Sequence, residues 1–388
     1  MEVWPLCVLF FLACSRTDGA MLKKLWRRLF LLVGVLVVCS GVRDAAGAVR
    51  SWWLVSPELL KHAKLEMVWQ TELPLKKGDS IRELRILGER IYMLSDGNHI
   101  VSMDRGNGNV IFSRSLAQAG FPVVGLELYE DELFTVVANE LVEINPEFGT
   151  VLGTRRLGFG VACPAARNSL CFYVSGTDRR IHTYRALDKV GLFQVAADND
   201  STITSIIADD NFVVFGTEAG NVVSITAGGP MRLWQFDAGG GIAGEVVRDG
   251  QSLFFASKDT NVYRVDMIDG LGGEFVWKYQ TAAVLDRAPR VGEKVVYQHV
   301  LYKGFEAIDK TSGEFMWQVP GGVELLAESG GKAYVIANGM LVVMDNIKKR
   351  RLYSVNFEGV SRYAVNTADS RIYIADKSGR IGCIKPVE

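Results

Sequence analysis

Short runs of β-branched and aromatic residues recur along the chain, and each run is bounded by Gly, Asp, Asn or Ser. Examples are NFVVFG at 211–216, SLFFAS at 252–257, KAYVIA at 332–337 and RIYIA at 371–375. Runs of this length and composition are typical of β-strands separated by tight turns. The pattern therefore predicts an all-β chain built from many short strands.

The strands belong to a repeat, and its clearest copy is AIDKTSGEFMW at 307–317. This stretch predicts a strand, a tight turn at Ser312-Gly313 and a second strand that ends on Trp317, because glycine accepts the positive φ of such a turn. Related stretches recur at intervals of 36 to 43 residues. The residues at the third position of each copy are Asp104, Asn145, Arg185, Thr226, Asp266, Asp309 and Asp345.

A period near 40 residues with about four strands in each unit is the signature of a β-propeller blade. The last unit lacks its fourth strand and its tryptophan, whereas LEMVWQTEL at 65–73 resembles the fourth strand of other units. We therefore expect this N-terminal strand to complete the last blade and close the ring, which removes exposed sheet edges. The predicted fold is an eight-bladed β-propeller of four-stranded antiparallel blades over residues 65–388.

Residues that recur with the repeat are interpreted as structural, because a catalytic residue is normally singular. The large aromatic residues are predicted to pack between blades, and the acidic residues to cap turns through hydrogen bonds to the backbone. The predicted blade-docking residues are Trp69, Phe112, Phe193, Trp234, Trp277, Trp317 and Tyr353, together with Asp104, Asp266, Asp309 and Asp345.

Residues 1–48 are interpreted as a targeting region. From Met21 the chain carries four basic residues, an apolar stretch over 29–42 and the small-residue sequence AAGA that ends at Ala48. This order predicts a signal peptide over 21–48 with cleavage after Ala48, and export to the periplasm or cell envelope. An uncleaved membrane anchor, lipidation at Cys14 or Cys39, and a true start at Met1 rather than Met21 stay open.

Residues 49–64 are predicted to form a connector with a short helix that begins at Ser56-Pro57-Glu58. In this connector Trp52 and Trp53 either pack against the propeller or touch a membrane surface. Farther along, Cys163 and Cys171 flank the tip of a predicted hairpin and are candidates for a disulfide, which an exported protein can keep.

Charge and motifs narrow the function classes. The net charge is −1, which gives no reason to expect nucleic acid as a partner. The four histidines are scattered without a second ligand at metal spacing, and the motifs of nucleophile elbows and phosphate loops are missing from the sequence. We therefore expect no catalytic residues, no metal and no cofactor. The basic run at 348–351 is either a solvated turn or a site for an acidic partner.

The stretch at 307–317 resembles the tryptophan-docking motif of quinoprotein-type (PQQ-like) propellers, and the resemblance extends over 65–388. The quinone-dependent alcohol dehydrogenases of this group use adjacent cysteines, a calcium site and a catalytic aspartate, whereas this chain has no adjacent cysteine pair. The BamB family of outer-membrane assembly lipoproteins is similar in length, blade number and export signal.

The second resemblance implies a non-enzymatic, monomeric scaffold in the cell envelope. Its partners would be envelope proteins, such as the outer-membrane barrel assembly machinery, with membrane contact only through the signal or anchor. Two alternatives are a PQQ-like oxidoreductase that binds a quinone or metal, and a polysaccharide-binding propeller.

Overall fold

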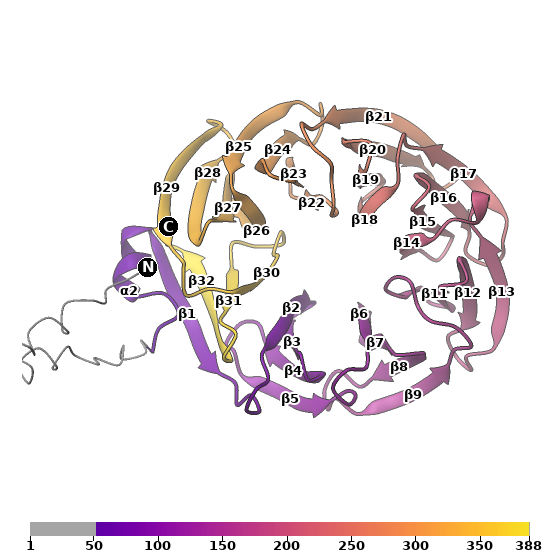
Figure 1. The fold of residues 1–388 in the computed structure, drawn as a ribbon, viewed down its shortest axis with the longest axis horizontal. Coiled ribbons are helices and arrows are strands. Elements are labelled where there is room, and N and C mark those ends of the chain that lie inside the picture. Colours follow the sequence, from indigo (N-terminus) through magenta and orange to yellow (C-terminus); the bar gives the residue numbers. More distant parts are fainter. Residues whose placement is uncertain (1–51, 388) are drawn as a thin grey trace, which may run out of the picture. The chain divides into compact units, whose positions relative to one another are not determined.

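The computed structural model describes residues 52–387. The predicted targeting region 1–48, with its questions of cleavage, anchoring, lipidation and true start, lies outside the described residues. The compact unit that begins at Trp53 contains eight separate four-stranded antiparallel sheets arranged as the blades of a ring (Figure 1). The predicted eight-bladed propeller is confirmed.

Seven of the eight blades use four strands that are consecutive in the chain, with the first strand innermost and the fourth outermost (Figure 1). Tight turns join these neighbours, as the recurrent Gly, Asn and Asp residues predict. Blades 1 to 4 consist of β2 Ile81–Leu87, β3 Arg90–Ser95, β4 His99–Asp104 and β5 Val110–Ser115; β6 Val123–Tyr129, β7 Glu132–Val137, β8 Glu140–Ile144 and β9 Val151–Arg156; β10 Ala166–Arg167, β11 Cys171–Ser175, β12 Arg180–Arg185 and β13 Gly191–Ala196; and β14 Ile203–Ala208, β15 Phe212–Thr217, β16 Asn221–Thr226 and β17 Arg232–Asp237.

The remaining blades repeat this order, except that the last one takes its fourth strand from the start of the propeller. Blades 5 to 8 consist of β18 Ile242–Asp249, β19 Ser252–Ser257, β20 Asn261–Ile268 and β21 Gly272–Gln280; β22 Arg290–Val291, β23 Val295–Val300, β24 Gly304–Asp309 and β25 Phe315–Pro320; β26 Gly322–Ser329, β27 Lys332–Ala337, β28 Met340–Asp345 and β29 Arg350–Asn356; and β30 Arg362–Ala364, β31 Ile372–Ala375 and β32 Arg380–Pro386 with β1 Leu65–Glu72.

Ring closure occurs where β1 pairs antiparallel with β32. The register runs from Leu65 opposite Pro386 to Glu72 opposite Arg380, with an irregularity between Met67 and Trp69. The N-terminal strand thus becomes the outer strand of blade 8, as the sequence predicts. Both ends of the propeller are held in one sheet, so unfolding of either end must break the same ladder of hydrogen bonds.

The hydrophobic core lies between the blades. The middle strands are nearly continuous runs of buried residues, as in β11 and β15, because a neighbouring blade covers each of their faces. One core cluster contains Tyr173 of blade 3 and Phe215 of blade 4, so it spans a blade interface. This double coverage explains why the middle strands read as apolar runs rather than as alternating patterns.

Two short helices interrupt the described chain. α2 spans Pro57–His62, and the Ser56 side chain accepts a hydrogen bond from the Leu59 N–H at 3.3 Å, as expected for an N-cap. Leu60 is buried in a core cluster together with residues of blades 7 and 8. A 3₁₀ turn, η1, covers Asp198–Asp200. Within residues 52–387, neither helix has the length and apolar character needed to cross a bilayer.

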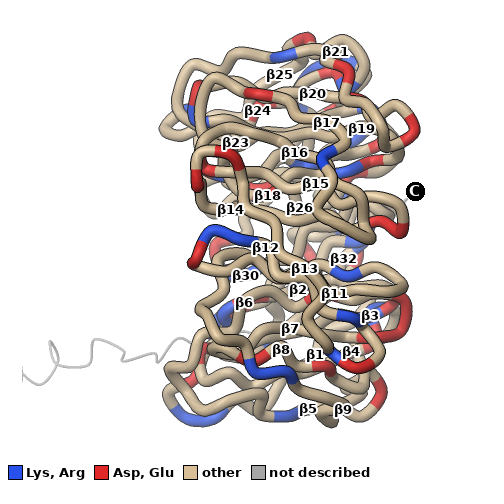
Figure 2. The backbone as a smooth tube through the Cα atoms, turned by 90° about the vertical axis from the view of Figure 1, so that its right-hand side faces the viewer, with Lys and Arg blue, Asp and Glu red and all other residues tan. Residues whose placement is uncertain are grey.

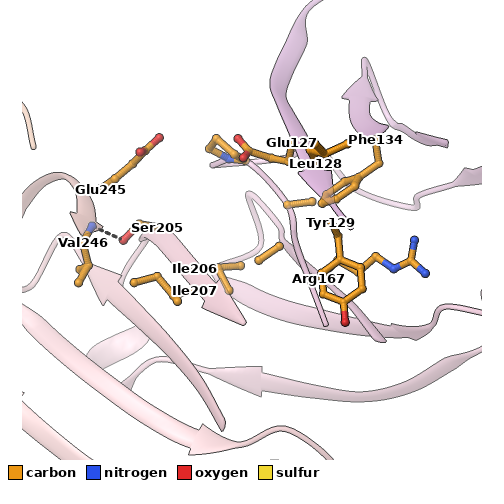
Figure 3. A pocket seen from close by; sticks show the side chains of 13 residues that line it. Glu127, Leu128, Tyr129, Phe134, Arg167, Ser205, Ile206, Ile207, Glu245 and Val246 are labelled. Atoms are coloured by element: carbon orange, nitrogen blue, oxygen red, sulfur yellow. Dashed lines mark hydrogen bonds between the residues drawn. The ribbon is translucent and has the colours of Figure 1, made fainter. Parts of the chain in front are cut away.

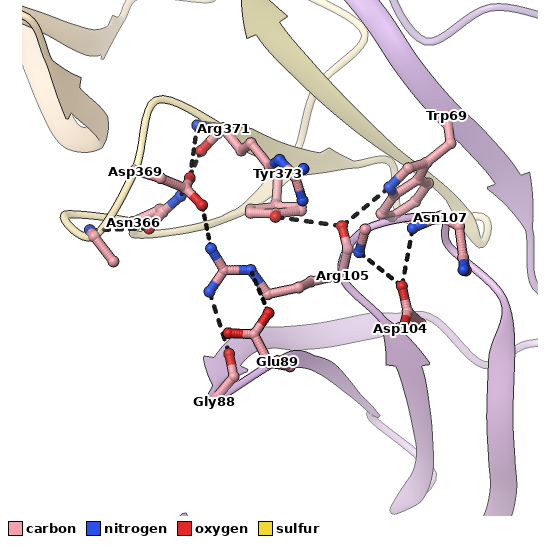
Figure 4. Close-up of polar contacts among 12 residues, drawn as sticks. Trp69, Gly88, Glu89, Asp104, Arg105, Asn107, Asn366, Asp369, Arg371 and Tyr373 are labelled. Atoms are coloured by element: carbon pink, nitrogen blue, oxygen red, sulfur yellow. Dashed lines mark hydrogen bonds and ion pairs between the residues drawn. The ribbon is translucent and has the colours of Figure 1, made fainter.

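The seam between blade 8 and blade 1 shows how adjacent blades dock (Figure 4). The indole Nε1 of Trp69 donates to the backbone oxygen of Arg105 at 3.1 Å, and Tyr373 donates to the same oxygen at 3.3 Å. Gly108 has φ of +76°, and a Cβ atom there would lie 2.5 Å from Trp69 Cε3. The indole ring therefore occupies the space that any larger residue at position 108 would need.

We expect Gly108→Ala to lower the free energy of unfolding by about 2–4 kcal/mol, because it combines left-handed backbone strain with displacement of the Trp69 ring. Gly78→Ala is the matched control, since Gly78 also has positive φ, +87°, but has no atom within 4 Å of its Cβ position. The control should cost about 1 kcal/mol. Urea unfolding measures both values, and equal losses would contradict the role of the Trp69 contact.

Candidate functional site

The predicted aromatic residues lie on outer strands and contact the turn of the following blade. A Cβ atom on Gly149 would lie 2.4 Å from the Phe112 ring, and one on Gly313 would lie 2.7 Å from the Trp277 ring. The Trp277 indole also donates to the Lys310 backbone oxygen at 3.0 Å. The packing of a ring onto a turn glycine, as seen at Trp69, therefore recurs at two other blade interfaces.

The other predicted aromatic residues make related contacts between blades. Trp234 lies against Gly273, where a Cβ atom would be 2.8 Å from the ring. Trp317 instead donates to Asn346 Oδ1 at 3.0 Å. Phe193 and Tyr353 are half-buried against neighbouring core clusters. All seven aromatic positions therefore lie at blade packing surfaces, and their energetic role stays a prediction that substitution can test.

Three of the four predicted aspartates cap turns. Asp309 Oδ1 accepts the backbone N–H groups of Thr311 and Ser312 at 2.9 and 2.8 Å. Asp104 and Asp345 accept the corresponding pairs of N–H groups in their own turns. These hydrogen bonds hold in place the turns on which the neighbouring aromatic rings pack.

Asp266 differs from the prediction that it caps a turn. Its carboxylate accepts two hydrogen bonds from the Arg264 guanidinium, at 2.9 and 2.8 Å. The repeat in blade 5 is longer than the others, so β20 continues to Ile268 and Asp266 lies inside the strand, opposite Glu274. The longer hairpin therefore moves the turn away from this aspartate.

The candidate disulfide between Cys163 and Cys171 is not formed, since both are buried free thiols. The hairpin places Asn168, not Cys163, opposite Cys171, whereas the segment of Cys163 lies beside Ser175, four residues farther along β11. Four residues of extended chain span about 13 Å, which is too far for a disulfide. Burial raises the pKa of the Cys163 thiol to about 12.

The innermost strands bring charged residues to the centre of the ring, around a cavity of about 390 Å³. Arg85 pairs with Glu127 at 2.6 Å, and Arg290 pairs with Glu324 at 2.8 Å. Burial raises the pKa of Glu127, although Arg85 acts in the opposite direction. Burial would lower the pKa of Arg290, but Glu324 overcomes this and raises it. Both ion pairs are partly buried.

A second cavity of about 260 Å³ adjoins the first and shares Glu127 and Glu245 with it (Figure 3). At its other end the Arg167 guanidinium lies over the Tyr129 ring, 5.2 Å from the centroid, and pairs with Glu132. Burial lowers the pKa of Arg167. The glutamates and this arginine therefore lie at separate ends of the cavity.

The sequence reasoning missed these channel residues. Their signal was the presence of charged residues among the apolar residues of a repeat's first strand, as in the runs RELRIL at 82–87 and LELY at 126–129.

The central cavity does not fit an anionic quinone. Its lining carries four glutamates and two arginines: Glu83, Glu127, Glu245 and Glu324, with Arg85 and Arg290. A quinone that bears three carboxylates would meet a net negative lining, and it would have to break existing ion pairs to be neutralised. Among residues 52–387, no group of three or more His, Cys, Asp or Glu residues is arranged to hold a metal ion.

A further surface feature lies on the turns that join third and fourth strands. Antiparallel neighbours place these turns on one side of every blade, which we call the turn face. Five of these turns each carry a large apolar side chain that is exposed to solvent, from 63% at Met231 to 89% at Leu187. These turn-face residues are Phe148, Leu187, Met231, Leu271 and Ile347. Tyr302, which is 93% exposed, lies on the opposite face in the turn between β23 and β24.

The surface charges are mixed. In the side view of Figure 2, Lys and Arg are interspersed with Asp and Glu, in keeping with a net charge of −1. Trp53, in the connector, is 40% exposed and lines a surface cavity with Lys61 and Lys64.

The sequence matches the family model described as "Outer membrane protein assembly factor BamB" over residues 60–279 and again over 218–371. The chain belongs to this BamB family. No protein with a curated description matches it significantly.

The fold of this BamB-family chain is similar to several solved propellers. The crystal structure of BamB from Moraxella catarrhalis superposes with a TM-score of 0.63 at 14% identity, over 83% of this chain and 97% of that one. The computationally designed Ika8 protein gives a TM-score of 0.63 at 14% identity, over 81% and 98%. The C-terminal WD40 domain of Sif2 gives 0.60 at 11% identity, over 83% and 98%. At these identities the likeness concerns the fold alone.

The turn carboxylate of Asp309 predicts a change of stability with pH. The Ser312 N–H is the main cause that lowers the pKa of Asp309 below its ordinary value of 3.8. A lowered folded-state pKa means that the ionised carboxylate stabilises the fold above about pH 3.8 and that this contribution is lost as the pH falls further. In Asp309→Asn, the free energy of unfolding should depend less on pH between 5 and 2.5 than in the wild type. The difference should stay below about 1 kcal/mol, because the site is screened by solvent. Melting temperatures measured across this pH range check the prediction.

The matched control for this change is Asp131→Asn. Asp131 is exposed and has no hydrogen bond or ion pair in the described structure. If both variants follow the wild-type acid profile, the turn hydrogen bonds of Asp309 do not stabilise the charged form as described.

Proposed function

We propose that this chain is a non-catalytic, exported scaffold that holds a protein partner in the cell envelope and takes part in outer-membrane protein assembly. The observation that carries the proposal is the set of exposed apolar side chains on the turn face of a BamB-family propeller. Four of them occur on successive blades, at Phe148, Leu187, Met231 and Leu271.

Exposed apolar groups of this size favour a protein partner on physical grounds. Full burial of one such side chain contributes about 1.5–3 kcal/mol, and clustered exposed apolar surface marks interaction sites. The turns that carry these groups are fixed by hydrogen bonds such as those of Asp345. A partner would therefore bind a preorganised surface and lose little free energy to ordering of the scaffold.

The test is site-specific photo-cross-linking in intact cells that produce the full chain. A photoreactive residue in place of Leu187 or Phe148 should cross-link one dominant envelope protein, with an outer-membrane barrel or its assembly factor as the expected product. The matched control is the same residue in place of Tyr302, which is equally exposed but lies on the opposite face. The proposal fails if the turn-face positions capture no envelope protein, or only what the Tyr302 position captures.

A further inference from the structure

A groove runs between blade 6 and blade 7 on the outside of the ring. Its cavity measures about 620 Å³, and every residue of β25 lines it together with residues of β28 and β29. Three methionines contribute to its walls, at positions 316, 340 and 344, with Val342 between the last two. Methionine side chains adapt to differently shaped partners, so such a groove suits binding of an apolar chain segment.

The groove follows β25 along its length and carries basic residues at one end. β25 runs from Phe315 near the turn face to Pro320 near the opposite face, a span of about 20 Å for six residues. Lys349, Arg350 and Arg351 line the groove and lie where β29 begins, so they gather at the turn-face end. The basic run noted in the sequence thus lies at one end of this apolar groove.

The charges of this basic end are not neutralised within the described residues. None of Lys349, Arg350 and Arg351 forms an ion pair there, although Lys349 contributes to the lowered pKa of Asp309. The carboxylates of Asp309 and Asp345 already accept backbone N–H groups of their own turns. A partner with acidic residues would therefore meet three cations that form no ion pair within the described residues.

One edge of the groove is also open to pairing. β25 is the last strand in the order β22-β23-β24-β25, so its outer edge pairs with no strand in the described part of the chain. Such an edge presents backbone N–H and C=O groups that an extended chain can engage.

We propose that this groove, the blade 6–7 groove, binds an extended segment of a partner protein. Apolar side chains of the segment would lie over Met316 and Met340, and acidic residues at one end would reach Lys349, Arg350 and Arg351. The proposal rests on the scaffold function proposed above and adds the chemistry of the bound segment. It assigns the basic run a binding role that a solvated turn would not have.

The test uses fluorescence anisotropy with the full chain and a labelled peptide that has three acidic residues followed by alternating valine and serine. We expect saturable binding that the triple variant Lys349→Glu, Arg350→Glu, Arg351→Glu weakens by about tenfold, because each lost pair contributes modestly and its replacement repels the peptide. Met316→Asp should weaken binding by a similar factor, and added salt should weaken it further. Lys76→Glu with Lys77→Glu, an exposed pair in the loop after β1, is the matched control and should bind as the wild type does.

Several outcomes would overturn the groove proposal. One is equal binding of a peptide with lysines in place of the acidic residues, and another is unchanged affinity in both groove variants while melting temperatures stay at the wild-type value. A dimer in sedimentation that the triple variant dissociates would make a second copy of the chain the occupant. Loss of binding to anionic vesicles, with unchanged peptide binding, would assign the basic run to lipid.

The groove and the scaffold function fail separately. If Leu187 cross-links an envelope protein but the peptide does not bind, the scaffold function stands and the groove proposal falls. If the peptide binds as predicted but the turn face captures no envelope protein, the envelope role falls and the groove remains a peptide site.

Discussion

The packing of a large aromatic ring onto a turn glycine of the next blade is the contact on which the rest of the structure depends. At the ring closure it joins Trp69 to Gly108, and within the chain it joins Trp277 to Gly313. A single four-stranded blade buries too little surface to be stable alone, and each of these contacts ties one blade to the next. The hydrogen bonds of aspartates such as Asp309 fix the turns that receive the rings.

This mode of packing also determines where partners can bind. Because the core lies between blades, side chains on the innermost strands form a charged channel, and those on the turns stay exposed. The channel charges of Arg85 and Arg290 are satisfied by glutamates. The turn face and the blade 6–7 groove, in contrast, carry apolar groups and cations without matching partners in the described chain. The outer surfaces therefore suit recognition better than the channel does.

The repeat made the fold predictable from the sequence, including the closing strand at 65–72, because blade period and turn chemistry are local properties. Details that depend on register were not predictable in this way. The hairpin around Asn168 is centred two to three residues beyond the position assumed for a disulfide, so Cys163 and Cys171 do not face each other. The longer turn of blade 5 moved Asp266 into a strand. The channel and the groove arise only when distant repeats are brought side by side.

The closed ring is tested most directly by native-state hydrogen exchange of the β1 amides that bond to β32. We predict that those amides between Met67 and Glu72 that bond to β32 exchange as slowly as the amides of β32 itself, and only through global unfolding, because both strands belong to one closed sheet. Fast exchange of β1 with continued protection of β32 would show an open ring with a detachable N-terminal strand. That result would contradict the account given for the fold and for its rigid binding surfaces.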